Sequence, residues 1–181
     1  FEGRGLPASS TNDKMDNYHG AGIGVVIDCE GGRGVIPSYS KAIVFDKDDK
    51  EIKTFDGGGD HFANFIKAVR SRKHTDLAAD ILDGHLSAAL CHTANISYVL
   101  GKKQSPEELR EAVKDNKDMA EALGRMEEHL AANQVDTKKT PATLGAVLKM
   151  NPKTERFVGN AAADELLTRN YRAPFVVPAK V

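Results

Sequence analysis

The hydrophobic pattern changes its period once along the chain, at the glycine run that ends at residue 59. Before this point, in residues 20–56, short runs rich in Val, Ile and Phe alternate with turns rich in Gly and Asp, which predicts a meander of antiparallel strands. After it, apolar residues recur with the helical period of about 3.6 residues. A run of strands followed by a run of helices predicts an α+β fold rather than an alternating α/β fold.

Two long helices are expected in the first half of the helical part. Asp60 is a plausible N-cap for a helix whose apolar stripe consists of Phe62, Phe65, Ile66 and Val69. A second helix, rich in small residues, is predicted over about Ile81–Leu100, and Gly101 is placed to end it.

The rest of the chain predicts shorter elements. Ser105–Glu108 reads "SPEE", a capping box with proline in the first helical position, which predicts the start of a helix. A separate amphipathic helix is predicted around Met119–Leu130. Two short strands are expected around a turn at Asn151–Thr154, and then a short helix capped by Asn160. Residues 1–19 have no period and are predicted to form a loop.

Composition excludes several classes of protein. The 181 residues suit one domain, 1–181, and are 40% hydrophobic and 28% charged, as in an ordinary globular protein. Twenty-five basic residues balance 26 acidic ones, so neither nucleic acid nor a membrane is expected as a partner. Two cysteines do not make a disulfide framework. The chain starts "FEGRG" without methionine, which suggests a fragment and leaves its localisation unknown.

The run "GAGIG" at Gly20–Gly24 is similar to a dinucleotide-binding loop, but its context is wrong. The third glycine of such a loop would fall at Val25, and the run precedes a strand instead of linking a strand to a helix. No helix N-terminus is then available for a pyrophosphate. The glycines are therefore predicted to lie at the start of an edge strand, and no cofactor is expected to bind to this chain.

His85 and His92 are the candidate substrate-side residues. They are seven residues apart, so on a helix they share one line, at the border of the apolar stripe. They are either polar groups that face a substrate cleft or boundary histidines that bind neighbouring groups, and the second reading is the more common one. A zinc site with Cys91 is disfavoured, because adjacent residues point about 100° apart on a helix. Catalytic residues are not identifiable.

Two further features have simple structural explanations. Asp60 and His61 could bind an anion beside the glycine run, but a helix cap is the simpler role. The basic residues of Arg70–His74 could meet a phosphate, but they also complement the negative end of a helix.

Three separated stretches carry a family resemblance: "GGGDHFANFIKAVRSRK", "ADILDGHLSAALCHTANISYVLG" and "NPKTERFVGNAAADELLTRNYRAPFVVP". Together they resemble the C-terminal domain of bacterial Gfo/Idh/MocA oxidoreductases, of the kind found in planctomycete-type bacteria. The resemblance implies a mostly antiparallel open sheet with helices packed on one face. It also implies a separate N-terminal Rossmann domain, absent from this chain, that would bind NAD or NADP. The E-K-P motif of the family does not occur here.

These observations predict the C-terminal substrate-binding and assembly domain of an NAD(P)-dependent oxidoreductase acting on a sugar, a polyol or a related small molecule. The fragment alone is expected to be inactive, and His85 and His92 are expected near the substrate cleft. Homo-oligomers are predicted to form through the sheet of residues 22–55. The alternative is a free-standing, non-catalytic binding or scaffolding module of the same fold, and a metal-dependent hydrolase is a remote third reading. The β-branched residues expected at the interface are Val25, Ile27, Val35, Ile43 and Val44.

Overall fold

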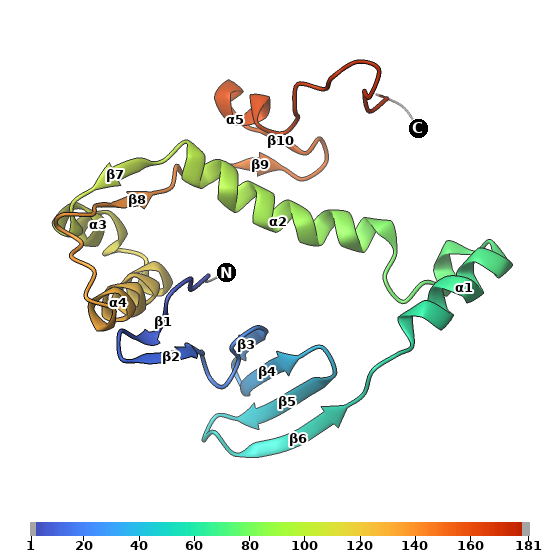
Figure 1. Ribbon diagram of the computed structural model, residues 1–181, viewed down its shortest axis with the longest axis horizontal. Coiled ribbons are helices and arrows are strands. Elements are labelled where there is room, and N and C mark those ends of the chain that lie inside the picture. The colour runs from blue at the N-terminus through green and yellow to red at the C-terminus, as the bar shows by residue number, and fades with distance from the viewer. Residues whose placement is uncertain (1–2, 179–181) are drawn as a thin grey trace. The chain divides into compact units, whose positions relative to one another are not determined.

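The computed structural model describes residues 3–178 (Figure 1). The chain falls into two compact units. The first unit takes the residues up to Asp80 together with Arg110–Thr140. The second takes Ile81–Leu109 together with the residues from Pro141 onward. The single domain predicted over residues 1–181 stays a prediction.

A four-stranded antiparallel sheet dominates the first unit, and this confirms the predicted meander. The segment "VIPSYSKAIVFD" contains parts of two strands that are joined by a turn at Tyr39 and Ser40, and the register of their pairing shifts between Val35 and Ser38. The strands are hydrogen-bonded in chain order: β3 (Val25–Cys29), β4 (Gly32–Ser38), β5 (Lys41–Asp46) and β6 (Glu51–Asp56).

The glycine run before β3 has a packing role. A Cβ atom at Gly24 would lie 2.0 Å from the carbonyl oxygen of Ile36, so only glycine fits where the chain approaches β4. β3 is an edge strand and continues through a turn into its antiparallel neighbour. The predicted edge-strand role is confirmed, and the run leads into a strand–turn–strand arrangement instead of the strand–loop–helix arrangement of a dinucleotide site.

The predicted N-terminal loop is wrong in part, because residues 1–19 contain an antiparallel hairpin of β1 (Pro7–Ser9) and β2 (Asn12–Met15). The hairpin packs on α4 (Lys117–Ala132). The backbone N–H of Ser10 donates to the Ala132 carbonyl at 3.0 Å. The side-chain amide of Asn133 donates to the Pro7 carbonyl at 2.9 Å. These partners are more than a hundred residues away in sequence, so the local pattern of the N-terminus contains no sign of them.

The first helix of the first unit begins at its predicted position. Asp60 caps α1 (His61–Ser71) by accepting a hydrogen bond from the Ala63 N–H at 2.9 Å. A short 3-10 helix, η1 (His74–Asp76), follows and packs against α1. The helix α3 (Pro106–Val113) begins in the second unit and ends in the first.

The second unit is built around the long helix α2 (Ile81–Val99). Two short antiparallel strand pairs accompany it, and a small cluster of buried side chains forms where α2 meets the second of these pairs and α5. The buried members of this cluster are Ile96, Phe157 and Ala163. The remaining elements are β7 (Lys102–Gln104) paired with β8 (Ala142–Leu144), β9 (Met150–Asn151) paired with β10 (Arg156–Phe157), and α5 (Ala161–Glu165).

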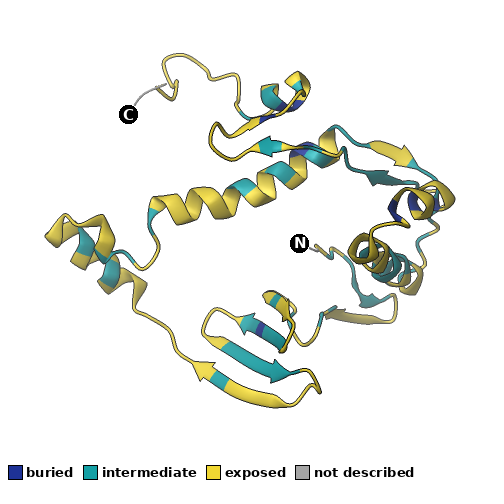
Figure 2. Ribbon diagram, turned by 180° about the vertical axis from the view of Figure 1, so that it is seen from behind, coloured by how far each residue is buried: buried dark blue, intermediate teal, exposed yellow. Residues whose placement is uncertain are grey.

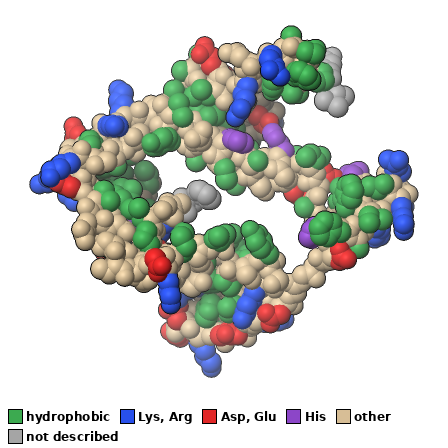
Figure 3. Space-filling model, in the orientation of Figure 1, with side chains coloured by type: hydrophobic (Ala, Val, Ile, Leu, Met, Phe, Trp, Pro, Cys, Tyr) green, Lys and Arg blue, Asp and Glu red, His purple; other side chains and the backbone are tan. Residues whose placement is uncertain are grey.

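The α+β class with antiparallel sheets is confirmed. The finer expectation, a layer of helices packed on one face of the sheet, stays a prediction. Few of the side chains in residues 3–178 are buried, as Figure 2 shows. Large apolar side chains stay exposed on the four-stranded sheet and on α1, where they are visible in the space-filling view (Figure 3).

Candidate functional site

The two predicted histidines lie on α2, both exposed to solvent. α2 ends two residues before Gly101. Glycine is required at position 101 because a Cβ atom there would lie 2.5 Å from the Leu144 carbonyl oxygen of β8. Seven residues of helix separate His85 from His92 by about 10 Å along the axis. The two rings are therefore too far apart to bind one small polar group together.

The structure gives His85 a partner that the sequence did not reveal. Its Nε2 atom lies 2.9 Å from Oε1 and 3.0 Å from Oε2 of Glu155. Both side chains are about half exposed, at 51% for His85 and 53% for Glu155. The pair joins an α2 residue to the turn of the β9–β10 hairpin, and it is the best-defined polar cluster of the second unit.

The turn between β9 and β10 fixes the position of Glu155. The N–H of Glu155 donates to the Asn151 carbonyl at 2.8 Å, and the side chain of Asn151 accepts from the Lys153 N–H at 2.9 Å. The backbone of Glu155 has a φ of +51°, in the left-handed region that favours glycine and asparagine. The predicted turn at Asn151–Thr154 is therefore confirmed and continues to Glu155.

Packing holds this hairpin on α2. Phe157 is 6% exposed and lies against Ile96 of α2 and Ala163 of α5. Its N–H donates to the side chain of Asp164 at 2.8 Å. Since Glu155 is only two residues before Phe157, the buried ring anchors the segment that carries the carboxylate.

A second connection fixes the segment after β8 to α2. The hydroxyl of Ser97 donates to the Ala146 carbonyl at 2.7 Å, and the Ala146 N–H donates to the Ser97 carbonyl at 2.9 Å. A Cβ atom at Gly145 would lie 2.4 Å from the Ser97 hydroxyl oxygen, so a side chain here would displace that hydroxyl from its hydrogen bond to Ala146.

Cys91, beside His92 in the sequence, is a free and exposed cysteine. No group of three or more His, Cys, Asp or Glu side chains within residues 3–178 could hold a metal ion. His92 is thus placed on α2 but is not brought into a cluster with His85.

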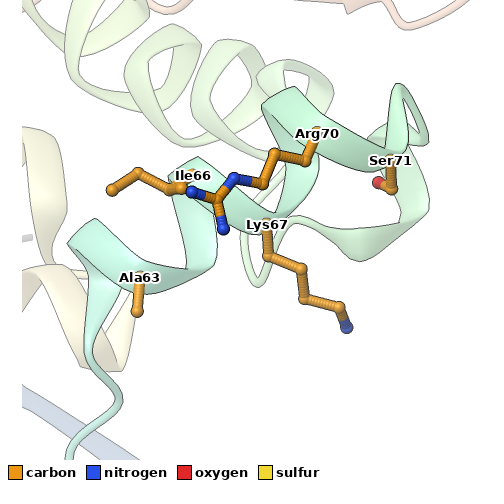
Figure 4. A pocket seen from close by; sticks show the side chains of 5 residues that line it. All are labelled: Ala63, Ile66, Lys67, Arg70 and Ser71. Carbon is orange, nitrogen blue, oxygen red and sulfur yellow. The ribbon is translucent and has the colours of Figure 1, made fainter.

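The features around α1 have structural roles. Lys67 lies 3.7 Å from the carboxylate of Asp76 in η1, and the Asn64 side chain donates to the Asp76 carbonyl at 2.7 Å. An open cavity of about 640 Å³ lies along one side of α1. Figure 4 shows that Arg70 runs back along the helix toward Ile66, whereas Lys67 points away. These basic side chains do not converge on one point.

A further polar cluster lies in the first unit, between the N-terminal residues and α4. Arg4 pairs with Asp16, and Nδ1 of the largely buried His129 lies 3.1 Å from the same carboxylate. Burial raises the pKa of Asp16, but hydrogen bonds from Arg4 and Asn17 and the charges of Arg4 and His129 outweigh it. The pKa of Asp16 is therefore lowered from its ordinary 3.8. His129 also lines a cavity of about 470 Å³ whose other walls are mainly apolar.

Comparisons with protein-family models, with curated proteins and with solved structures find no match for this chain. The family resemblance in the sequence therefore stays a prediction. No helix among residues 3–178 is both long and apolar enough to span a membrane.

Proposed function

We propose that the chain is the substrate-binding and assembly part of an NAD(P)-dependent oxidoreductase of the Gfo/Idh/MocA type, acting on a sugar, a polyol or a related compound. The observation that supports its assembly role is the apolar face of the four-stranded sheet. The oxidoreductase assignment rests on the three sequence stretches that resemble this family.

The register of the strands defines that face. Side chains opposite each other in an antiparallel pair lie on the same side of the sheet. Val25 and Ile27 of β3 therefore share a face with Val44 of β5 and Phe55 of β6, and Gly34 of β4 contributes no side chain between Ile27 and Val44. Ile36 of β4 and Lys53 of β6 lie on the same face, with the Lys53 ammonium 4.7 Å from the centroid of the Phe55 ring. Val25, Ile27 and Phe55 are each about half exposed. We call the side chains of Val25, Ile27, Val44 and Phe55 the apolar sheet face.

An apolar sheet face of this kind is typical of a surface that another protein covers. A second copy of this chain is the proposed partner, in line with the association through residues 22–55 expected from the sequence. The coenzyme would be held by another domain, because the residues at Gly20–Gly24 do not fit it. The position that a Cβ would take at Gly24 is filled by the Ile36 carbonyl of a neighbouring strand.

The assembly part of the proposal is tested by multi-angle light scattering of the whole chain over a range of concentrations. We expect a dimer or larger species that Ile27→Lys converts to monomer, because the substitution would replace an exposed apolar side chain of the apolar sheet face with a charged one. Tyr39→Lys is the matched control, since Tyr39 lies fully exposed in the β4–β5 turn. A wild-type chain that stays monomeric at high concentration would contradict the proposal.

The coenzyme part is tested by calorimetry with NAD and with NADP. We expect no binding to this chain, and micromolar affinity would overturn the assignment of the coenzyme to another domain. The complete reading frame separates the two functional readings. A strand–GxGxxG–helix unit in frame before residue 1 supports the oxidoreductase, whereas a start codon immediately before it supports the free-standing module.

A further inference from the structure

The side chain of His129 is buried without a hydrogen-bond partner. It is 8% exposed, and neither of its ring nitrogens makes a hydrogen bond to another residue within 3–178. Buried polar groups in folded proteins are normally paired, and one that is left unpaired lowers the stability of the fold. The unpaired nitrogens of His129 therefore call for a partner from outside the chain, which is either a water molecule or a ligand.

The same ring lines the cavity of about 470 Å³ beside α4. Pockets that hold small molecules have volumes of about 300–1,000 Å³ and mainly apolar walls with a few polar groups. Here the polar side chains of the wall are those of Arg4 and His129. Its α4 residues recur at intervals of three or four, so they share one face of the helix. The apolar side chains of the wall are Leu6, Ala122, Leu123, Met126 and Leu130.

Asp16 determines which nitrogen of His129 can bind a ligand. A carboxylate oxygen of Asp16 lies 3.1 Å from Nδ1. Its negative charge repels a lone pair on Nδ1 and favours a proton there, so the neutral ring has its lone pair on Nε2. Asp16 is not part of the cavity wall, whereas His129 is. The ring edge that carries Nε2 is thus left for the cavity.

The wall and the lone pair together select a class of ligand. The lone pair on Nε2 binds a group that donates a hydrogen bond, and the apolar wall favours a hydrocarbon body. An anionic ligand would lose its hydration and would meet the negative charge of Asp16, while Arg4 is already paired with that carboxylate. An uncharged phenol fits both requirements, because its ring is apolar and its hydroxyl donates.

The cavity has a side chain that can open the way to Nε2. Both ring nitrogens are closed to water, so a ligand reaches Nε2 only when part of the wall moves. Met126 lies one turn before His129 on α4 and is 38% exposed. A methionine side chain is unbranched and flexible, so it can change its position to fit a ligand.

We propose that the cavity beside α4 binds a small uncharged phenol, with the aromatic ring against the apolar wall and the hydroxyl donating a hydrogen bond to Nε2 of His129. None of the residues involved belongs to the apolar sheet face or to the His85–Glu155 pair. The phenol site and the proposed function therefore stand or fall separately.

The ligand class is tested with 4-ethylphenol, 4-ethyltoluene and 4-ethylbenzoate, which differ only in the hydroxyl, methyl or carboxylate group on one ring. Long-range ¹H–¹⁵N NMR spectra of the full chain follow the His129 nitrogens, whose signals are identified by their loss in His129→Phe. We expect 4-ethylphenol to bind with a Kd below about 1 mM and to shift the Nε2 signal, and the other two compounds to bind about tenfold more weakly. No saturable shift of the His129 signals by 4-ethylphenol overturns the proposal, and so does equal affinity for either analogue.

The role of Nε2 is tested in His129→Phe, which keeps a planar ring and removes the acceptor. Affinities are measured from the NMR signals of the ligands. We expect the variant to bind 4-ethylphenol and 4-ethyltoluene equally, because no hydrogen bond then distinguishes them. A variant that still prefers 4-ethylphenol about tenfold overturns the assignment of the hydrogen bond to His129.

The position of the ligand is tested by a variant that keeps His129. Ala122→Leu places extra volume in the cavity wall and should weaken 4-ethylphenol binding at least about tenfold. Ala120→Leu is the matched control, because Ala120 is an exposed residue of α4 that does not line the cavity, and it should leave the affinity unchanged. Equal affinity of Ala122→Leu and wild type overturns the proposal, because the phenol would then bind elsewhere.

Discussion

Replacing Phe157 by alanine should destabilise the second unit strongly and displace the candidate site. The ring is 6% exposed, and it packs against Ile96 and Ala163, which are 5% and 0% exposed. Truncation of a buried phenylalanine costs about 3–5 kcal/mol of unfolding free energy. We expect a value near about 3 kcal/mol, because the surrounding side chains are only partly buried and can close over part of the space. The side chains that flank the cluster in this way are Leu100, Leu148, Met150 and Leu167.

Two comparison variants make the magnitude informative. Phe157→Leu retains most of the apolar volume and should cost less than about 1.5 kcal/mol. Phe175→Ala removes a ring that is 70% exposed and lies over Arg172, so it should cost less than about 1 kcal/mol. The expected order of destabilisation is Phe157→Ala, then Phe157→Leu, then Phe175→Ala.

The assay is urea unfolding followed by far-ultraviolet circular dichroism, which suits a chain that contains no tryptophan. A second readout is the NMR signal of His85 in the folded protein. Because the β9 and β10 strands are two residues long, their backbone pairing alone cannot hold the turn, and Phe157→Ala should also reduce the fraction of His85 rings whose Nε2 donates to the Glu155 carboxylate. Equal unfolding midpoints for Phe157→Ala and Phe175→Ala would refute the claim that this ring anchors the hairpin.

Two further predictions concern stability away from the histidine pair. Since the folded-state pKa of Asp16 lies below 3.8, its contribution to stability is present above the unfolded-state pKa and is lost as the pH falls through the folded-state value. Asp16→Asn should therefore lower the urea concentration at the unfolding midpoint at neutral pH. It should also make this midpoint fall less steeply as the pH decreases from about 5 to about 2. The same pH dependence of the midpoint in wild type and variant would argue against the pairing of Asp16 with Arg4. Gly145→Ala should cost about 1–3 kcal/mol in thermal unfolding, since the new Cβ would lie 2.4 Å from the Ser97 hydroxyl oxygen. Gly124→Ala is the control, because no atom lies within 4 Å of a Cβ built at Gly124, and it should stabilise α4 slightly. A similar change in stability for both variants would contradict the role given to Gly145.

Signals that depend on near neighbours in the sequence predicted the helix starts well. Asp60 caps α1 and Asn160 caps α5, each by accepting a hydrogen bond from an N–H three residues later. The Ser105 N–H donates to the Glu108 carboxylate and the Glu108 N–H donates to the Ser105 hydroxyl, as the capping box requires. The Ser105 hydroxyl also donates to this carboxylate, and the bonds from Ser105 lower the pKa of Glu108. The start of α4 was placed less well, because Asn116 caps it before the apolar stripe becomes visible.

Contacts between distant residues could not be predicted in the same way. The pairing of β1 with β2 depends on support from α4, and β7 finds its partner in β8 some 40 residues later. His85 was identified from its helical spacing, but its partner Glu155 is 70 residues away in the sequence. Nothing in the local pattern of either segment specifies the other, because the contact results from how Phe157 packs on α2.

The apolar sheet face also has a thermodynamic consequence. Side chains such as Ile27 and Phe55 are about half exposed in the single chain, so part of the free energy available from burying them is released only when a partner covers them. Folding and association are then linked by mass action. If a second copy covers this face as proposed, we expect the melting temperature of the protein to depend on its concentration, with a dilute sample unfolding at a lower temperature than a concentrated one.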